Sequence, residues 1–171
     1  MNTVRYDLPE VDDFTRPYWD AAAQGRLLLR RCADCGRAHH YPREFCPYCW
    51  AGEERVTWEQ AGGRAVLYTW SVIHRNDLPP FGERVPYVAA VVDLEEGPRL
   101  MTELVPASGG GSSGGGSFGD GGVVSGAGSS GAGGVVSGAG SSGAGLRVGM
   151  PLEVAFREAA EGVWVPVFGV A

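Results

Sequence analysis

The sequence predicts a mainly β protein in which an N-terminal helix and a small cysteine-bearing ribbon precede a five-stranded barrel. Two observations support this fold class. Four cysteines stand in two C-x2-C pairs within residues 32–49, and short turns of this kind bring their thiols to one point. From Val56 onward, five runs rich in Val, Tyr, Trp and Thr alternate with Gly, Pro and acidic turns. That alternation is typical of successive short strands.

The N-terminal segment, residues 1–31, is expected to be helical in its middle. Asp12 or Asp13 is the expected cap, and apolar residues follow at near-helical spacing. A run of three alanines favours helix, and Gly25 ends it. Three consecutive leucines then predict a short strand that leads into the first cysteine pair.

A structural zinc site is expected from Cys32, Cys35, Cys46 and Cys49, in a rubredoxin-like zinc ribbon over residues 32–55. All four cysteines are used, so the coordination sphere is closed and the metal stabilises structure without catalysing. Iron, an empty site and disulfides are the alternatives. Disulfides are disfavoured because the start of the chain lacks the basic and apolar segments of a signal peptide.

The barrel is expected over residues 56–171. Its five predicted strands are Gly63–Arg75, Pro86–Leu94, Arg99–Val105, Pro151–Arg157 and Gly162–Val170. Five strands of this size fit a Greek-key barrel of OB type.

Between the third and fourth of these strands lies a low-complexity insertion, residues 107–145, made almost entirely of Gly, Ser, Ala and Val. Within it GVVSGAGSSGAG occurs twice without change, at 122–133 and 134–145. So few large side chains cannot offset the entropy lost on ordering. We interpret the segment as a tolerated loop expansion in preference to a functional arm. Such repeats also pack as extended strands, which leaves partial order open.

Composition narrows the classes of partner. The net charge is −6, and all fourteen basic residues are arginine. A negative net charge argues against a nucleic-acid binder. Arginine binds phosphate and carboxylate better than lysine does, because its planar guanidinium donates two parallel hydrogen bonds. No apolar run reaches the roughly 18 residues of a membrane span. We therefore expect a cytoplasmic protein without a membrane partner.

A series of short motifs runs in order through nearly the whole chain outside the insertion. They are Tyr18-Trp19, Gly25–Leu27, Arg31–Gly36, Tyr41–Arg43, Cys46–Cys49, Tyr68–Arg75, Pro86–Ala89, Glu96–Leu100, Leu146–Val154 and Pro166–Phe168. This set resembles the acyl-CoA-associated OB-fold/zinc-ribbon family, long labelled domain of unknown function 35. The chain departs from that family in its long insertion and at Trp50, where a glycine often follows the second cysteine pair.

The resemblance implies an acyl-CoA-binding accessory subunit, or an excised domain, that assembles with a thiolase-superfamily enzyme. The most specific expectation is a retro-aldolase acting on β-hydroxyacyl-CoA in steroid or lipid side-chain degradation. A thiolase or a hydroxymethylglutaryl-CoA synthase-like enzyme is an alternative partner. In steroid degraders the family's domain can be fused to an enoyl-CoA hydratase-like domain, so a hydratase-like domain or subunit is a further expected neighbour.

The sequence offers no catalytic set. Its histidines are His39, His40 and His74, it has no G-x-S-x-G motif, and every cysteine is assigned to metal. His74 as a base or thioester contact is less favoured than His74 as a partly exposed residue near an interface. We therefore expect no catalysis by this chain alone, and the base and enolate-stabilising groups to come from the partner.

Binding residues are easier to nominate. Arg43, Arg75 and Arg99 are candidate contacts for the phosphates of CoA, since bidentate arginines suit phosphate; ordinary solvated or salt-bridged arginines are the alternative. Tyr41, in a stiff Tyr-Pro-Arg turn, and Phe81, flanked by prolines and glycine, are candidate interface residues. Phe81 folded back over the barrel mouth is the alternative for that loop.

Two functions of other classes remain as hypotheses. A zinc-ribbon/OB nucleic-acid module would stack bases on barrel aromatics, although the negative charge and absence of lysine disfavour it. A stand-alone acyl-CoA enzyme is disfavoured by the missing nucleophile.

Overall fold

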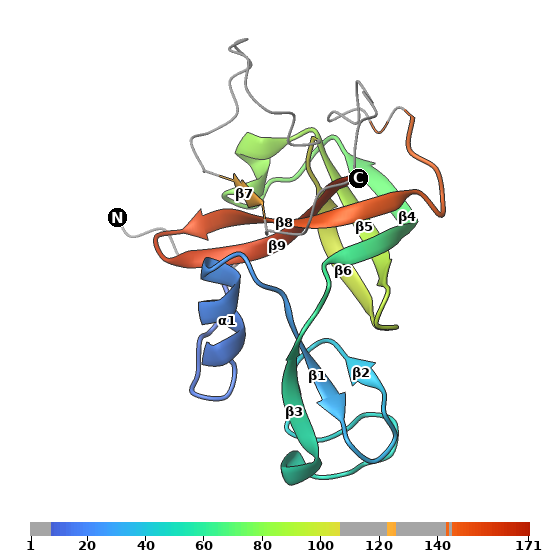
Figure 1. Cartoon of the computed structure of the whole chain (residues 1–171). Helices are drawn as coiled ribbons and strands as arrows, with labels where there is room; N and C mark the ends of the chain where they lie inside the picture. Colours follow the sequence, from blue (N-terminus) through green and yellow to red (C-terminus); the bar gives the residue numbers. More distant parts are fainter. Residues whose placement is uncertain (1–7, 107–122, 126–142, 144) are drawn as a thin grey trace.

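The computed structural model describes residues 8–106, 123–125, 143 and 145–171, and places a small ribbon sheet and a helix beside a β-barrel (Figure 1). Its elements are α1 (Arg16–Ala23), β1 (Leu28–Cys32), β2 (Ala38–His39), η1 (Glu53–Arg55), β3 (Val56–Gln60), β4 (Arg64–Ile73), η2 (Phe81–Arg84), β5 (Tyr87–Leu94), β6 (Arg99–Leu104), β7 (Val123–Ser125), β8 (Pro151–Ala160) and β9 (Val163–Val170). The predicted fold class is confirmed.

Helix α1 ends as its sequence predicts, but its N-cap is Thr15 in place of the expected Asp12 or Asp13, and Thr15 makes no side-chain capping hydrogen bond. Of the two expected caps, Asp12 closes the turn before the helix: its carboxylate accepts the backbone N–H of Thr15 at 2.6 Å. Thr15 Oγ1 in turn accepts the backbone N–H of Asp12 at 3.2 Å, so the two residues satisfy each other. At the other end Gly25 adopts a left-handed φ of 71°, and the N–H of Arg26 returns to the carbonyl of Ala21.

The ribbon is a three-stranded antiparallel sheet in the order β2-β1-β3. Its strands begin at Leu28 and end at Gln60, so they extend on both sides of the cysteine-bearing loops. The domain boundaries expected from the sequence stay a prediction, because strand pairing alone does not divide the chain into folding units.

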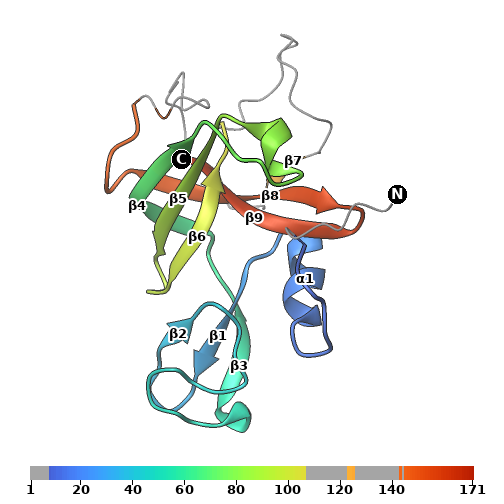
Figure 2. The same cartoon turned by 180° about the vertical axis from the view of Figure 1, so that it is seen from behind.

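The barrel consists of β4, β5, β6, β9 and β8 in that spatial order, and β4 also pairs with β8 to close it. Figure 2 shows β4, β5 and β6 side by side on the face away from the viewer in Figure 1. All neighbouring pairs are antiparallel except β6 and β9, which meet in parallel at Leu104 and Phe168. Each strand run predicted after residue 62 therefore becomes a barrel strand.

One hydrophobic core fills the barrel and continues under α1. Phe156 of β8 and Phe168 of β9 are fully buried at its centre. Tyr18 and Ala22 join the same core from α1, and Leu29 joins it from β1. The helix thus links the barrel to the ribbon, since it packs against β9 and β1 at once.

The predicted insertion lies mostly outside the described residues. The described strand within it, β7, pairs antiparallel with β8 from Val123–Arg157 to Ser125–Ala155, which agrees with the partial order left open above. Among the residues the structure describes, no helix is long and apolar enough to cross a membrane.

Candidate functional site

The four cysteines lie on two turns with the same backbone pattern. In the first, the N–H of Gly36 donates to the carbonyl of Cys32; in the second, the N–H of Trp50 donates to the carbonyl of Cys46, both at 3.0 Å. Each turn places one buried and one exposed cysteine at the same end of the ribbon sheet. Local turn geometry therefore supplies two ligands from each side.

The thiols fit a zinc ion. All four Sγ atoms lie within 4.8 Å of one another, with Cys32 to Cys49 and Cys35 to Cys46 each at 3.6 Å. A tetrahedral site with Zn–S bonds of about 2.3 Å requires sulfur atoms about 3.8 Å apart, whereas a disulfide requires about 2.05 Å. The four cysteines are thus unbridged and positioned for metal, as the zinc prediction requires.

The backbone also prepares one thiol for metal. Burial raises the pKa of Cys46, but the backbone N–H groups of Tyr48 and Cys49 and the neighbouring thiols outweigh it and lower that pKa to about 7. Zinc binds the thiolate, so donors aimed at this sulfur favour the form that the metal takes.

Trp50, in the second cysteine turn, adopts the left-handed backbone conformation that a glycine adopts more easily. Its φ is 63°, close to the 72° of Gly36 at the equivalent position of the first turn. A left-handed conformation costs a residue with a side chain about 1–2 kcal/mol. Trp50 is 76% exposed, and its ring stacks on Phe45 with centroids 5.4 Å apart. The departure noted in the sequence therefore leaves the turn's backbone conformation unchanged.

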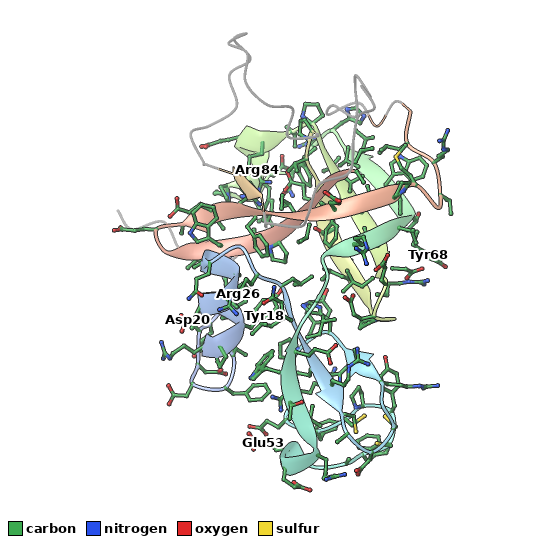
Figure 3. All side chains as sticks on the ribbon, in the orientation of Figure 1. Tyr18, Asp20, Arg26, Glu53, Tyr68 and Arg84 are labelled. Carbon is green, nitrogen blue, oxygen red and sulfur yellow. The ribbon has the colours of Figure 1, made fainter. Side chains whose placement is uncertain are left out.

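A polar cluster lies between α1 and the ribbon. Figure 3 shows Tyr18 on the side of α1 that faces the ribbon, and its hydroxyl lies 3.2 Å from Nε2 of His40. Burial raises the pKa of Tyr18, and burial together with the neighbouring His39 lowers the pKa of His40 to about 4. Burial and the charge of Arg30 lower the pKa of His39 as well. At neutral pH both imidazoles are therefore uncharged.

Two of the three arginines nominated for CoA, Arg75 and Arg99, lie far from each other. Arg75 follows β4 and pairs with Asp77 at 3.2 Å, while Arg99 of β6 donates to Asp93 at 2.6 and 3.0 Å. Ile73, at the end of β4 before Arg75, pairs with Tyr87 of β5, and Arg99 of β6 pairs with Asp93 of β5. Six residues of strand span roughly 20 Å, so Arg75 and Arg99 do not converge on one phosphate.

Arg43 differs from the other two. It is exposed in the ribbon loop after β2, and its guanidinium has no ion pair or side-chain hydrogen bond with the residues that the structure describes. It is the nominated arginine that stays available to a bound anion.

The two nominated interface residues differ in exposure. Tyr41 is 57% exposed beside the ring of His40. Phe81 begins η2 and is half-buried, with its ring 6.2 Å from Tyr87 and the Arg84 guanidinium over it at 5.8 Å. Arg84, seen near η2 in Figure 3, is in turn paired with Glu103 of β6.

In the same loop Leu78 is the more exposed apolar residue, at 57%. Sequence reasoning passed over it because a leucine beside two prolines carries no local signal of exposure. Phe81 packs against Tyr87 of β5, whereas Leu78 stays exposed.

Sequence reasoning also missed an aromatic–arginine contact on the barrel wall. Tyr68 of β4, 46% exposed and labelled in Figure 3, carries the Arg99 guanidinium 3.3 Å from its ring centroid. The contact joins β4 to β6 across β5, so only the pairing of distant strands reveals it.

A catalytic arrangement is not found among the described residues. His74 is exposed just beyond β4, and no described nucleophile or carboxylate is hydrogen-bonded to it. The other two histidines face α1, and the cysteines converge on the metal position. What the described residues offer is a metal-stabilised ribbon and exposed binding groups.

Comparison with known proteins matches both parts of the chain. Residues 19–55 match the family model "ChsH2, rubredoxin-like zinc ribbon domain" and residues 58–110 match "ChsH2, C-terminal OB-fold domain". The two matched ranges are separated by Val56 and Thr57, at the start of β3.

Among relatives, the chain is 39% identical over 99 residues to a probable enoyl-CoA hydratase alpha subunit of Thermomonospora curvata, covering 57% of this chain and 29% of the relative. It is 31% identical over 104 residues to the benzoylsuccinyl-CoA thiolase subunit BbsA of Thauera aromatica, covering 59% of this chain and 69% of the relative. The chain therefore spans less than a third of the hydratase subunit.

Among solved structures, the Ltp2-ChsH2(DUF35) aldolase contains a chain that is similar over its whole length. The match has a TM-score of 0.63 and 28% identity, and covers 95% of this chain and 98% of that chain.

Proposed function

The chain belongs to the DUF35 family of rubredoxin-like zinc-ribbon and OB-fold proteins, and from that premise we propose that it is an acyl-CoA-binding accessory subunit or domain of a thiolase-superfamily enzyme. The most specific form of the proposal is a complex that cleaves a β-hydroxyacyl-CoA by retro-aldol chemistry, in the degradation of a steroid or lipid side chain.

One observation carries this proposal. The matched chain of the Ltp2-ChsH2(DUF35) aldolase is covered over 98% of its length, at 28% identity and a TM-score of 0.63. A similarity that includes helix, ribbon and barrel supports a similar docking role more strongly than a shared barrel alone would.

In the proposed reaction a base removes the proton of the β-hydroxyl, the bond between the α and β carbons breaks, and a carbonyl compound leaves. The electron pair of that bond becomes a thioester enolate, which takes up a proton to give the shortened acyl-CoA. Enolate charge needs donors held in place before it develops. The described residues of this chain present no such arrangement, so we assign the base and the donors to the partner.

The proposed contribution of this chain is to hold the CoA end of the substrate and to help assemble the complex. Arg43 is the best placed of the nominated arginines, because it is exposed and has no described partner. Arg75 and Arg99 already have carboxylate partners, so contact with CoA would require them to exchange or share those ion pairs. Tyr41 lies next to the Arg43 turn and supports an interface that includes the bound thioester.

The test is affinity purification of the full chain from its native host, followed by assays of the chain alone and with the recovered partner. We expect a thiolase-superfamily subunit to co-purify, and acyl-CoA cleavage only when both are present. Turnover by the purified chain alone would overturn the accessory role, and recovery of nucleic acid in place of protein would favour the zinc-ribbon/OB nucleic-acid hypothesis.

A second candidate is an accessory subunit of a thiolase, favoured by the similarity to the benzoylsuccinyl-CoA thiolase subunit. The two reactions differ in their need for free CoA: thiolysis consumes it as the nucleophile, whereas retro-aldol cleavage does not. Omitting free CoA from the reconstituted assay therefore separates them. The relation to a hydratase alpha subunit supports a hydratase-like neighbour for either complex.

A further inference from the structure

A row of three large side chains crosses the ribbon sheet on the face toward α1. Arg30 is in the central strand β1, with His39 of β2 opposite it on one side and Trp58 of β3 opposite it on the other. Residues directly opposite in antiparallel strands share a face and have Cβ atoms about 5 Å apart. The guanidinium and the imidazole of this row are therefore neighbours.

Both polar members of the row are buried, and several of their polar atoms have no hydrogen-bond partner among the described residues. Arg30 is 4% exposed and His39 is 2% exposed. Within hydrogen-bonding geometry, the Nε and Nη2 atoms of Arg30 and both ring nitrogens of His39 have no partner among the described residues. The backbone of Arg43 nevertheless lies close enough to His39 to raise its pKa, against the larger effect of burial. Buried polar groups are nearly always satisfied, and buried charges are nearly always paired, so this pair departs from the usual pattern twice.

Aromatic rings hold the guanidinium but do not use its N–H groups. The Cζ atom of Arg30 lies 4.9 Å from the ring centroid of Trp58 and 5.3 Å from that of Phe14. Cation–π contact of this kind attracts the charge from the face of the guanidinium plane. The edge of the plane, where Nε and Nη2 carry their protons, has no acceptor among the residues that the structure describes.

The chain itself shows what that edge binds. Arg31, the next residue, donates through Nε and Nη2 to both carboxylate oxygens of Glu59. Arg99 donates through the same two atoms to both oxygens of Asp93. The Nε and Nη2 groups of an arginine commonly bind the two oxygens of one oxyanion in this bidentate way. Arg30 presents the same fork, and none of the described carboxylates occupies it.

We propose that Arg30 and His39 form a binding site for a small-molecule oxyanion of the carboxylate or phosphate class, with Arg30 as the bidentate donor. His39 adds a ring N–H from the neighbouring strand. Phe14 precedes α1 and covers the guanidinium, so its side chain must turn aside to admit the anion. Of the arginines assigned to CoA, Arg43 is close enough to affect the pKa of His39. The oxyanion site stands whether or not the proposed function holds.

The test uses the zinc-loaded full chain and follows its denaturation midpoint while sodium phosphate or sodium acetate is added at constant ionic strength, with sodium chloride as the balancing salt. A ligand that binds only the folded state raises the midpoint with the logarithm of its concentration above Kd. We expect such a rise with at least one of the two anions. A rise with phosphate alone assigns the phosphate class, and a rise with acetate alone the carboxylate class.

Variants separate specific binding from general salt effects, since excluded anions such as phosphate also stabilise proteins without a site. Arg30→Gln should abolish the anion-dependent rise and His39→Asn should reduce it, while Arg147→Gln, at an exposed position outside the cluster, should leave it unchanged. An equal rise in wild type and Arg30→Gln overturns the proposal, as does no rise above chloride with either anion.

A measurement on the wild-type chain covers the case in which Arg30→Gln does not fold. The side-chain Nε–Hε resonance of Arg30 should shift saturably in NMR spectra with the same Kd as the denaturation midpoint. The corresponding resonance of Arg147 should not. A resonance of Arg30 that ignores both anions would show that aromatic packing alone accounts for its position.

Discussion

The hydroxyl of Tyr18 and Nε2 of His40 lie 3.2 Å apart, and this contact joins helix α1 to the ribbon. His40 has a second ring nitrogen, Nδ1, that is buried without a hydrogen-bond partner in the described part of the chain. Protonating this imidazole in the folded protein would place an uncompensated charge between helix and ribbon. Its protonation is therefore coupled to the stability of that junction.

The free energy of unfolding should decrease as the pH is lowered, because of His40. Burial, with a smaller contribution from His39, lowers its pKa from 6.5 to about 4 in the folded protein. Between pH 6.5 and about pH 4, the imidazole of His40 is therefore protonated in the unfolded chain but neutral in the folded chain. The stability present above pH 6.5 should decrease by roughly 3 kcal/mol across this window, as measured by denaturant unfolding.

A pair of variants isolates this effect from acid release of zinc, which all the proteins share. His40→Gln should lose most of the slope between pH 6.5 and 4. His74→Gln, at an exposed position, should keep the wild-type slope. Identical slopes in wild type and His40→Gln would contradict the assignment.

Zinc should be present at close to one ion per chain, held by the four converged thiols. Changing Cys46, which is buried, to serine should unfold the ribbon, because structural zinc contributes on the order of 10 kcal/mol to local folding. Elemental analysis and the loss of ribbon amide resonances measure this. A strong chelator should reproduce the same spectrum in the wild-type chain; a metal-free chain with free thiols and an intact ribbon would refute the zinc site.

Replacing the insertion, residues 107–145, with a short turn should leave the fold and partner binding intact. Loop-closure entropy changes only slowly with length, so stability should shift by roughly 1 kcal/mol or less. Calorimetric unfolding and partner affinity test this. The shift includes loss of the three-residue pairing between β7 and β8.

The identical repeats provide a matched control for that replacement. Removing residues 134–145 deletes one copy of GVVSGAGSSGAG and leaves the other joined to Leu146. This shorter deletion keeps the sequence that forms β7. If the full replacement abolishes partner binding and the single-copy deletion does not, the arm has a role in the complex.

Arg43→Ala should weaken use of CoA thioesters by the reconstituted complex. A charge-assisted hydrogen bond contributes about 1.5–3 kcal/mol, so KM should rise by about tenfold or more with kcat little changed. Steady-state kinetics on full-length CoA and on a pantetheine thioester, which lacks the nucleotide, separates phosphate contact from other effects. An equal loss on both substrates would argue against a phosphate contact.

Phe81→Ala should weaken assembly with the partner, by about tenfold or more in Kd if the loop is an interface anchor. Because Phe81 packs on Tyr87 and Arg84, part of any loss could come from disorder of η2. Leu78→Ala distinguishes the two, since Leu78 is 57% exposed and its truncation should affect the interface without loosening the loop. Wild-type affinity in both variants, measured by titration calorimetry, would remove this loop from the interface.

Much of the architecture was predictable because its signals are local. The cysteine pairs Cys32–Cys35 and Cys46–Cys49 specify two tight turns through residues that are neighbours in sequence. Gly25 ends the helix for the same reason, whereas the cap at its start is Thr15 and not the expected Asp12 or Asp13, because Asp12 closes the preceding turn. The strand runs were visible because alternating β-branched and aromatic residues favour extended backbone wherever they stand.

What only the tertiary structure decided is which charged and aromatic groups meet. Arg75 and Arg99 looked alike in sequence, and each forms an ion pair with a carboxylate close to it in the chain, Asp77 and Asp93. Strand register then places the two arginines at opposite ends of β5. In the sequence, nothing distinguished Arg30 from any other basic residue near a cysteine pair. The pairing of β1 with β2 and β3 buries it beside Trp58 and His39. The separation of Arg75 from Arg99 and the burial of Arg30 depend on contacts between residues far apart in the chain. Local propensity carries no information about such contacts, because burial and pairing are set by how the strands align once the whole sheet has formed.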